Sequence, residues 1–349
     1  MILIEVFADY FTVTLNGQAQ QYDRGDISPL IIADAGGNDT LSIVGSDADE
    51  IGRLEPHEIK FYDDGNLLVD ASGIESIQVD AGQGVNKALL FDSVGNDRVF
   101  MQGTSARLYG PGYDNRATNF QSMTAIAQRG GHDEAFVLDT DQNESFISTP
   151  SIAMMIGDDY MNRAIGFNRL QSLATLGEDQ AILFDSPGND RAFVSQGLAR
   201  MVGPRKRTTT VRGFDTVQLD ASSGGVDRID IYDTPQDDKL EVNADNVKLF
   251  TDIDDTDGVN YDLLAQAYYF ARVNAHGHRG GTNVKDENAD EQQRLYELAY
   301  YGDWEAVLSF KKTARFHLPC SSQAYAKLDV TDSASFVLNE PSLWKAQWK

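Results

Sequence analysis

The chain has few cysteines, few prolines and little positive charge. Its 349 residues include one cysteine and nine prolines, and 29 Lys and Arg stand against 54 Asp and Glu, which gives a formal net charge of −25. One cysteine excludes an internal disulfide framework, so packing, backbone pairing or bound ions must hold the fold. The deficit of basic residues disfavours a nucleic-acid partner, because binding a phosphate backbone needs clustered positive charge.

Long apolar runs are also missing. No segment approaches the 18 apolar residues of a transmembrane helix, so we predict no membrane span. The opening residues, MILIEVFADYFTVTLNG, carry Glu5 and Asp9 where a secretory signal has basic residues, and no signal peptide is visible. The chain is 41% hydrophobic and can bury a core.

Familiar catalytic motifs are absent from the sequence. It contains no GxSxG, GxxxxGK[ST], HExxH or CxxC pattern, and no GxGxxG that follows a strand. Hydrolase-elbow, P-loop, zinc and dinucleotide-binding interpretations therefore have no support.

A repeat of about 47 residues runs through most of the chain. The segment LFDSVGNDRVF, which begins at Leu90, returns as LFDSPGNDRAF at Leu183, with weaker copies before, between and after them. The anchor aspartates are 47, 46 and 48 residues apart: Asp92, Asp139, Asp185 and Asp233. An aromatic marker recurs every 47 residues: Phe120, Phe167 and Phe214. Fixed periods of this length indicate a repeat architecture.

Each repeat consists of short apolar runs between Gly, Asn and Asp turns, a pattern typical of strands. We predict an all-β protein that folds as a right-handed parallel β-helix, with two coils of roughly 23 residues per repeat. The anchor aspartates would then form one ladder, and the three phenylalanines one internal stack.

Two regions interrupt the period and suggest boundaries. We expect a β segment or cap over residues 1–55, the repeat solenoid over 56–282, a short helical insertion over 283–310 and a C-terminal β segment or cap over 311–349. The helix is predicted because Leu295, Leu298 and Ala299 stand near helical spacing among good helix formers.

Two resemblances suggest where the protein acts. The run GGNDTLSI, which begins at Gly36, resembles half of a hemolysin-type (RTX) calcium nonapeptide, whose turns bind calcium between the coils of a β-roll. The longer repeat, with FDSxGND and NRAxxF, resembles the degenerate repeats of very large bacterial surface or exported proteins. The second resemblance implies an extracellular or cell-surface location.

Calcium is the one cofactor we consider, and we expect it not to be required. Asp39 lies in the RTX-like turn, and an acidic loop supplies further carboxylate oxygens, the ligands that calcium prefers. The loop residues are Asp252, Asp254, Asp255 and Asp257. Their spacing does not fit the helix–loop–helix calcium pattern, so any site there is irregular.

His276, His278 and Arg279 are the weak catalytic candidates. The histidines alternate, so in a strand both would face one side, with the arginine beside them. Polysaccharide lyases and epimerases use a basic residue to abstract a proton and a cation to stabilise the resulting charge.

We favour a non-enzymatic structural or adhesive module whose partner is a protein or polysaccharide surface. A carbohydrate-active β-helix enzyme, either a polysaccharide lyase or a uronate epimerase, is the first alternative. A calcium-stabilised RTX-like exoprotein module is the second. The net charge of −25 argues against the enzyme, because a uronate polymer is a polyanion.

Overall fold

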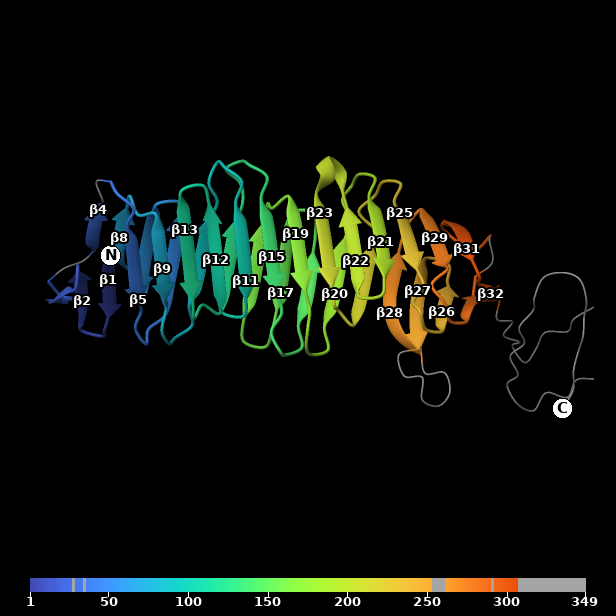
Figure 1. The fold of residues 1–349 in the computed structure, drawn as a ribbon, viewed down its shortest axis with the longest axis horizontal. Coiled ribbons are helices and arrows are strands. Elements are labelled where there is room, and N and C mark those ends of the chain that lie inside the picture. Colours follow the sequence, from blue (N-terminus) through green and yellow to red (C-terminus); the bar gives the residue numbers. More distant parts are fainter. Residues whose placement is uncertain (27–28, 34–35, 253–260, 290–291, 307–349) are drawn as a thin grey trace, which may run out of the picture. The chain divides into compact units, whose positions relative to one another are not determined.

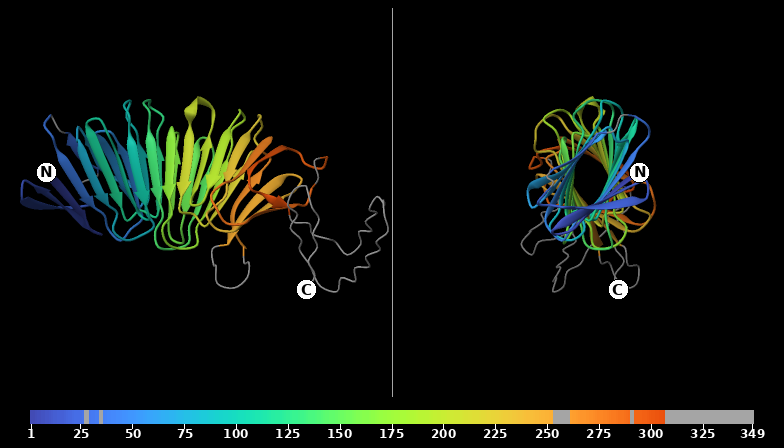
Figure 2. Two further views of the ribbon diagram at one scale, coloured as in Figure 1. Left: turned by 45° about the vertical axis from the view of Figure 1, so that its right-hand side comes forward. Right: turned by 90° about the vertical axis from the view of Figure 1, so that its left-hand side faces the viewer.

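A computed structural model describes residues 1–26, 29–33, 36–252, 261–289 and 292–306. The chain divides into two compact units, the first Met1–Phe193 with Gly197–Asp227 and the second Val194–Gln196 with Arg228–Lys349. The described residues are nearly all in strands and form a parallel β-solenoid, which confirms the predicted fold class (Figures 1 and 2). No helix among them has the length and hydrophobicity to cross a lipid bilayer.

Two sheets build the first unit. The strands of the first sheet are β1 (Ile2–Val6), β2 (Tyr10–Leu15), β3 (Gln18–Asp23), β5 (Thr40–Val44), β9 (Ser76–Asp80), β11 (Arg98–Gln102), β12 (Ser105–Gly110), β13 (Tyr113–Thr118), β15 (Glu134–Leu138), β19 (Arg169–Leu173), β22 (Leu198–Val202) and β23 (Thr208–Arg212). A short 3-10 turn, η1 (Pro204–Lys206), precedes β23.

The second sheet of this unit faces the first in Figure 2. Its strands are β4 (Leu30–Ala33), β6 (Glu50–Glu55), β7 (Glu58–Asp63), β8 (Asn66–Ser72), β10 (Lys87–Phe91), β14 (Ser122–Ile126), β16 (Ser145–Ser148), β17 (Ile152–Ile156), β18 (Met161–Ile165), β20 (Gln180–Phe184) and β24 (Thr216–Asp220). One strand, β21 (Arg191–Ser195), has residues in both compact units.

Each repeat contains a three-stranded antiparallel meander inserted into an otherwise parallel sheet. In one repeat β11, β12 and β13 pair antiparallel, and the outer two pair in parallel with β15 and β9. The next meander, β16–β18, lies in the second sheet. Successive repeats therefore place their meanders on opposite sheets.

Strand pairing corrects the predicted coil length. In the first unit parallel partners lie about 36 residues apart, as Lys87 of β10 and Ser122 of β14 do, and not 23. The meander lengthens each coil because two of its three strands are extra strands of the same sheet. The chain passes through them before it crosses to the opposite sheet. The period of 47 is nevertheless that of the structural repeat.

The predicted single ladder of aspartates is also wrong. Asp92 follows β10 of the second sheet, whereas Asp139 follows β15 of the first sheet. The phenylalanines alternate in the same way, because Phe120 follows a first-sheet strand and Phe167 a second-sheet strand. Their predicted burial is confirmed, since each ring is at most 4% exposed, and Phe214 contacts Phe146, with ring centroids 6.0 Å apart.

Alternating burial along the strands fills the space between the sheets. In β11, Val99 and Met101 are fully buried while their neighbours are exposed. This period of two is the pattern of a strand with one face on a core and one in water.

The second unit has the same plan. One sheet contains β25 (Arg228–Tyr232), β29 (Arg272–Gly277) and β31 (Glu297–Gly302), and the other β26 (Asp238–Val242), β27 (Asn246–Asp252), β28 (Tyr261–Tyr268), β30 (Asn283–Glu287) and β32 (Glu305–Ala306). Its meander is β26–β28.

The helix predicted over 283–310 is wrong for the residues that the structure describes there. Leu298 and Ala299 lie in β31, opposite Val273 and Asn274 of β29, and Leu295 is 77% exposed. Pairing with the edge of a parallel sheet outweighs the helix propensity of this segment.

Candidate functional site

A six-residue turn recurs where the chain crosses from one sheet to the other, and we call each copy an acid turn. The second residue is Ser or Thr and the sixth is Asp or Glu. The acid turns are residues 45–50, 92–97, 139–144 and 185–190 in the first unit and 233–238 in the second.

Hydrogen bonds inside each acid turn join the second residue to the sixth. The main-chain N–H of Ser93 donates to Asp97 Oδ2 at 3.1 Å, and its hydroxyl donates to the same carboxylate. The N–H of Thr234 donates to Asp238 Oδ2 at 2.7 Å in the second unit. These bonds close the turn, which explains why a hydroxyl residue and an acid recur at this spacing.

Each acid turn is also bonded to the coil beside it. The N–H of Asp97 donates to Asp133 Oδ1 at 2.9 Å, and the side chain of Asn96 accepts the N–H of His132 at 2.8 Å. The first residue, Asp92, accepts the N–H of Arg129 at 2.8 Å. The side chains thus replace the main-chain ladder where the strands end, which keeps buried N–H groups bonded.

A glycine on the neighbouring coil allows the main chain of that coil to lie close to the acid turn. Gly131 has φ +84°, and a Cβ there would lie 1.7 Å from the carbonyl oxygen of Gly95. The equivalent glycines face turn carbonyls in the same way: Gly84, Gly177, Gly225 and Gly281. The pattern Gly-x-[Asp/Asn] therefore marks the coil that receives each acid turn.

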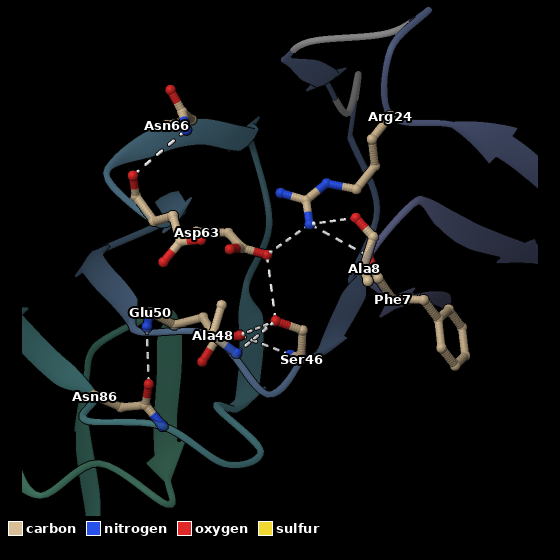
Figure 3. A network of polar contacts seen from close by, with 10 residues as sticks. Phe7, Ala8, Arg24, Ser46, Ala48, Glu50, Asp63, Asn66 and Asn86 are labelled. Carbon is tan, nitrogen blue, oxygen red and sulfur yellow. Dashed lines mark hydrogen bonds and ion pairs between the residues drawn. The ribbon is translucent and has the colours of Figure 1, made fainter.

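Figure 3 shows the first acid turn. The N–H of Ser46 donates to Glu50 Oε1 at 2.6 Å, and the N–H of Glu50 donates to Asn86 Oδ1 at 2.8 Å. Arg24 forms an ion pair with Asp63 at 3.0 Å, beside the hydroxyl of Ser46. Burial, with repulsion from Asp63 and Asp49, raises the pKa of Glu50 to about 7 although Ser46 donates to it.

Each of two acid turns belongs to a group of three buried carboxylates that lie close together. In each group, oxygens of all three residues lie within 4.8 Å of one another: Asp139, Glu144 and Asp179 in one, Asp185, Asp190 and Asp227 in the other. At the ends of the series an amide replaces the third acid, as Asn86 and Asn283. Negative charge is therefore concentrated in the central turns.

In two of the acid turns a tyrosine hydroxyl donates a hydrogen bond to the carboxylate of the sixth residue. Tyr113 donates to Asp97 Oδ1 at 2.7 Å, and Tyr160 donates to Glu144 Oε1 at 3.1 Å. A glycine three residues earlier makes room for each ring, since a Cβ on Gly157 would lie 2.3 Å from the ring of Tyr160. Burial and the neighbouring carboxylate raise the pKa of both tyrosines, so they stay protonated donors.

The turn 185–190 has no such tyrosine. Arg207 stands 47 residues after Tyr160, and its guanidinium donates to the carbonyl oxygens of Pro150 and Gly166 at 2.8 and 3.4 Å. Asp190 instead lines a small cavity of about 20 Å³ together with Gly203 and Arg207.

The predicted catalytic residues lie in the second unit. His276 points outward from β29 between Tyr232 and Tyr301, with ring centroids 4.3 and 4.8 Å away and nearly parallel planes. Its Nε2 lies 3.4 Å from Asp230 Oδ1, which also accepts from Asn274 at 2.8 Å. Burial would raise the pKa of Asp230, but hydrogen bonds from Asn274, Arg228 and His276 lower it.

Arg279 joins this group and His278 lies apart from it. The guanidinium of Arg279 lies over the ring of Tyr232 at 5.5 Å, and its N–H donates to Asp233 of the acid turn. His278 follows the end of β29 and lies against Gly302 of β31. The structure therefore brings His276 and Arg279 to one tyrosine; their catalytic role remains a prediction.

The predicted calcium ligands are separated. The N–H of Asp39 donates to Glu75 Oε2 at 2.8 Å, and Asp252 ends β27. Asp254, Asp255 and Asp257 lie outside the described residues. The two groups of converging carboxylates lie elsewhere, and calcium binding at the predicted positions stays a prediction.

Sequence reasoning found only part of this site. It singled out Asp92, Asp139 and Asp185, but not the third carboxylates of the neighbouring coil, such as Asp179 and Asp227. The pattern Gly-x-[Asp/Asn] recurs 35 to 37 residues after the end of each acid turn of the first unit, and this spacing was the signal that could have identified them.

Comparisons with protein-family models, with curated proteins and with solved structures find no match to this chain.

Proposed function

We propose that the chain is a structural β-solenoid module of an exported or surface-associated bacterial protein, which spaces or presents other surfaces and carries out no reaction. One observation carries this proposal: the acid turns and their bonds to the neighbouring coil recur from residue 45 to residue 238. The feature that repeats along the chain is therefore the acid turn, which joins one coil to the next.

Inward and outward positions of the meanders differ in a way that fits this role. The inward positions Val99, Phe146 and Leu240 are all fully buried and apolar. The outward residue that follows each varies from Phe to Ile to Glu, at positions 100, 147 and 241. Packing constrains the inside, whereas no single surface chemistry is kept outside.

Acidity and the repeat resemblance support an exported or surface location. A net charge of −25 keeps a long repeat soluble and resists lateral association between copies. The FDSxGND repeat resembles those of very large surface or exported proteins. These features suggest where the module acts but name no partner.

Protease treatment of intact cells tests the location. Cells of the organism that makes the protein would be treated with a protease that cannot enter them, and the chain followed by antibody. We expect loss of the chain from intact cells, with a cytoplasmic marker as the control. Protection until lysis would contradict a surface location.

A polysaccharide assay tests the absence of turnover. Alginate and pectate would be incubated with the full chain and calcium, and new unsaturated ends or altered uronate stereochemistry measured. We expect neither. Turnover that His276→Ala abolishes, and that the exposed-histidine control His132→Ala leaves intact, would replace the structural role with the enzyme.

A further inference from the structure

We propose that Asp185, Asp190 and Asp227 bind one calcium ion, between the acid turn 185–190 and the coil beside it. Oxygens of these three residues lie within 4.8 Å of one another. Calcium binds oxygens at about 2.3–2.6 Å, so ligands on opposite sides of one ion stand up to about 5 Å apart. The oxygens are thus close enough to share an ion.

Because the three carboxylates are buried, their negative charge is energetically unfavourable without a cation nearby. Asp185, Asp190 and Asp227 are 1%, 4% and 2% exposed. No ion pair joins any of them to Lys or Arg within the described part of the chain. Buried carboxylates are normally paired, protonated or bound to a metal, because leaving water costs an isolated charge several kcal/mol.

One buried carboxylate oxygen of this cluster has no hydrogen-bond partner in the described residues. Asp185 Oδ1 accepts the N–H of Ser223 at 2.9 Å, but Oδ2 is buried with no hydrogen-bond partner in the described residues. An unpaired carboxylate oxygen in this position has a free lone pair for a cation.

The missing tyrosine distinguishes this cluster from the two preceding acid turns, 92–97 and 139–144. Asp97 and Glu144 each accept a tyrosine hydroxyl, whereas Asp190 faces the cavity near Gly203. A Cβ on Gly203 would lie 2.8 Å from Asp190 Oδ1, so this oxygen points toward that side. The cavity of about 20 Å³ has room for about one water, which could join the carboxylate oxygens as a ligand.

Only oxygen ligands are present, which favours a hard cation over zinc or copper. Calcium suits the cluster better than magnesium, because calcium accepts irregular geometry and carboxylate-rich sites, while magnesium keeps most of its water.

Calorimetric titration of the chelator-treated full chain with calcium chloride at neutral pH tests the proposal, with magnesium chloride run in parallel. Terbium luminescence and the thermal midpoint give independent readouts. We expect Asp227→Asn to remove one bound calcium, or to weaken it about tenfold or more, and to remove its stabilisation. The matched control Asp133→Asn changes the equivalent residue of a tyrosine-supported turn and should leave that binding unchanged.

Three results would overturn the site. They are no calcium binding by the folded wild-type chain, equal losses of binding in Asp227→Asn and Asp133→Asn, or unchanged calcium stoichiometry and affinity in Asp227→Asn. If Asp227→Asn fails to fold, Arg207→Tyr provides a second variant, because a tyrosine there would fill the cavity and is expected to weaken calcium binding.

Discussion

The main-chain N–H of Asp190 donates to Asp227 Oδ1 at 2.7 Å, across 37 positions of the chain. Both residues are buried, and the bond joins an acid turn to the coil that packs on it. Asp227 is therefore a hydrogen-bond acceptor that joins the two segments, and it also carries negative charge in the cluster. Mutation can separate these two roles.

Asp227→Ala should destabilise the chain more than Asp227→Asn in the absence of calcium. Alanine leaves the buried N–H of Asp190 without an acceptor, which costs about 1–3 kcal/mol. Asparagine keeps an oxygen at Oδ1 and removes repulsion within the cluster. Urea unfolding followed by circular dichroism at neutral pH measures both; equal losses would show that the bond contributes little.

Gly131→Ala should destabilise the chain more than Gly17→Ala. Both glycines have positive φ, +84° and +82°, which costs alanine about 1–2 kcal/mol in each case. Only Gly131 adds a clash, with its Cβ 1.7 Å from the carbonyl oxygen of Gly95, whereas nothing lies within 4 Å at Gly17. The difference in unfolding free energy should be about 1–3 kcal/mol. Equal effects would mean that the coils are not held this closely.

Tyr113→Phe should cost about 1.5–3 kcal/mol, because Asp97 loses a buried hydroxyl donor. Tyr109→Phe is the matched control, since its ring stacks on Phe100 and its hydroxyl makes no hydrogen bond within the described residues. Chemical denaturation of the two variants tests this expectation. A control as destabilised as Tyr113→Phe would assign the effect to packing.

Stability without calcium should rise as the pH falls from 8 to about 5. Burial and repulsion raise the pKa of Asp133, Asp227 and Asp238 to about 6, and that of Glu50 to about 7, all above their values in an unfolded chain. The folded state therefore binds protons more tightly in this range. Its stability is greatest below the unfolded pKa and decreases as the pH rises through the folded pKa.

Thermal midpoints measured across this range in chelator test the direction of the effect. Asp227→Asn should flatten the dependence by removing one titrating group, at about 1.4 kcal/mol for each unit of its pKa shift. Stability that instead increases from pH 5 to 8 would contradict the buried state of these carboxylates.

The repeat and its strands were predictable from the sequence because the inward positions and turns follow the same short spacing in each copy. Asp92 and Asp139 were correctly recognised as equivalent. Their placement on opposite sheets was not predictable, since repeats related by a half-turn have the same sequence pattern as repeats stacked directly.

The third carboxylate of each cluster was missed for a related reason. Asp227 acts on Asp190 from the next coil, and the predicted coil length was wrong because two strands of each meander stay in one sheet. The helix predicted near Leu298 failed because the spacing of apolar residues is ambiguous over such a short segment, and the available sheet edge decided the outcome.

Removing one repeat tests the central claim most directly, namely that the solenoid is built from 47-residue steps joined by acid turns. Excision of residues 93–139 joins Asp92 to Thr140 and restores a complete acid turn, whereas excision of 93–115 removes about half a repeat and joins unlike positions. Circular dichroism and thermal unfolding of both chains should show a cooperatively folded β protein for the first and loss of cooperative folding for the second. An unfolded first chain, or two chains that fold equally well, would contradict the account.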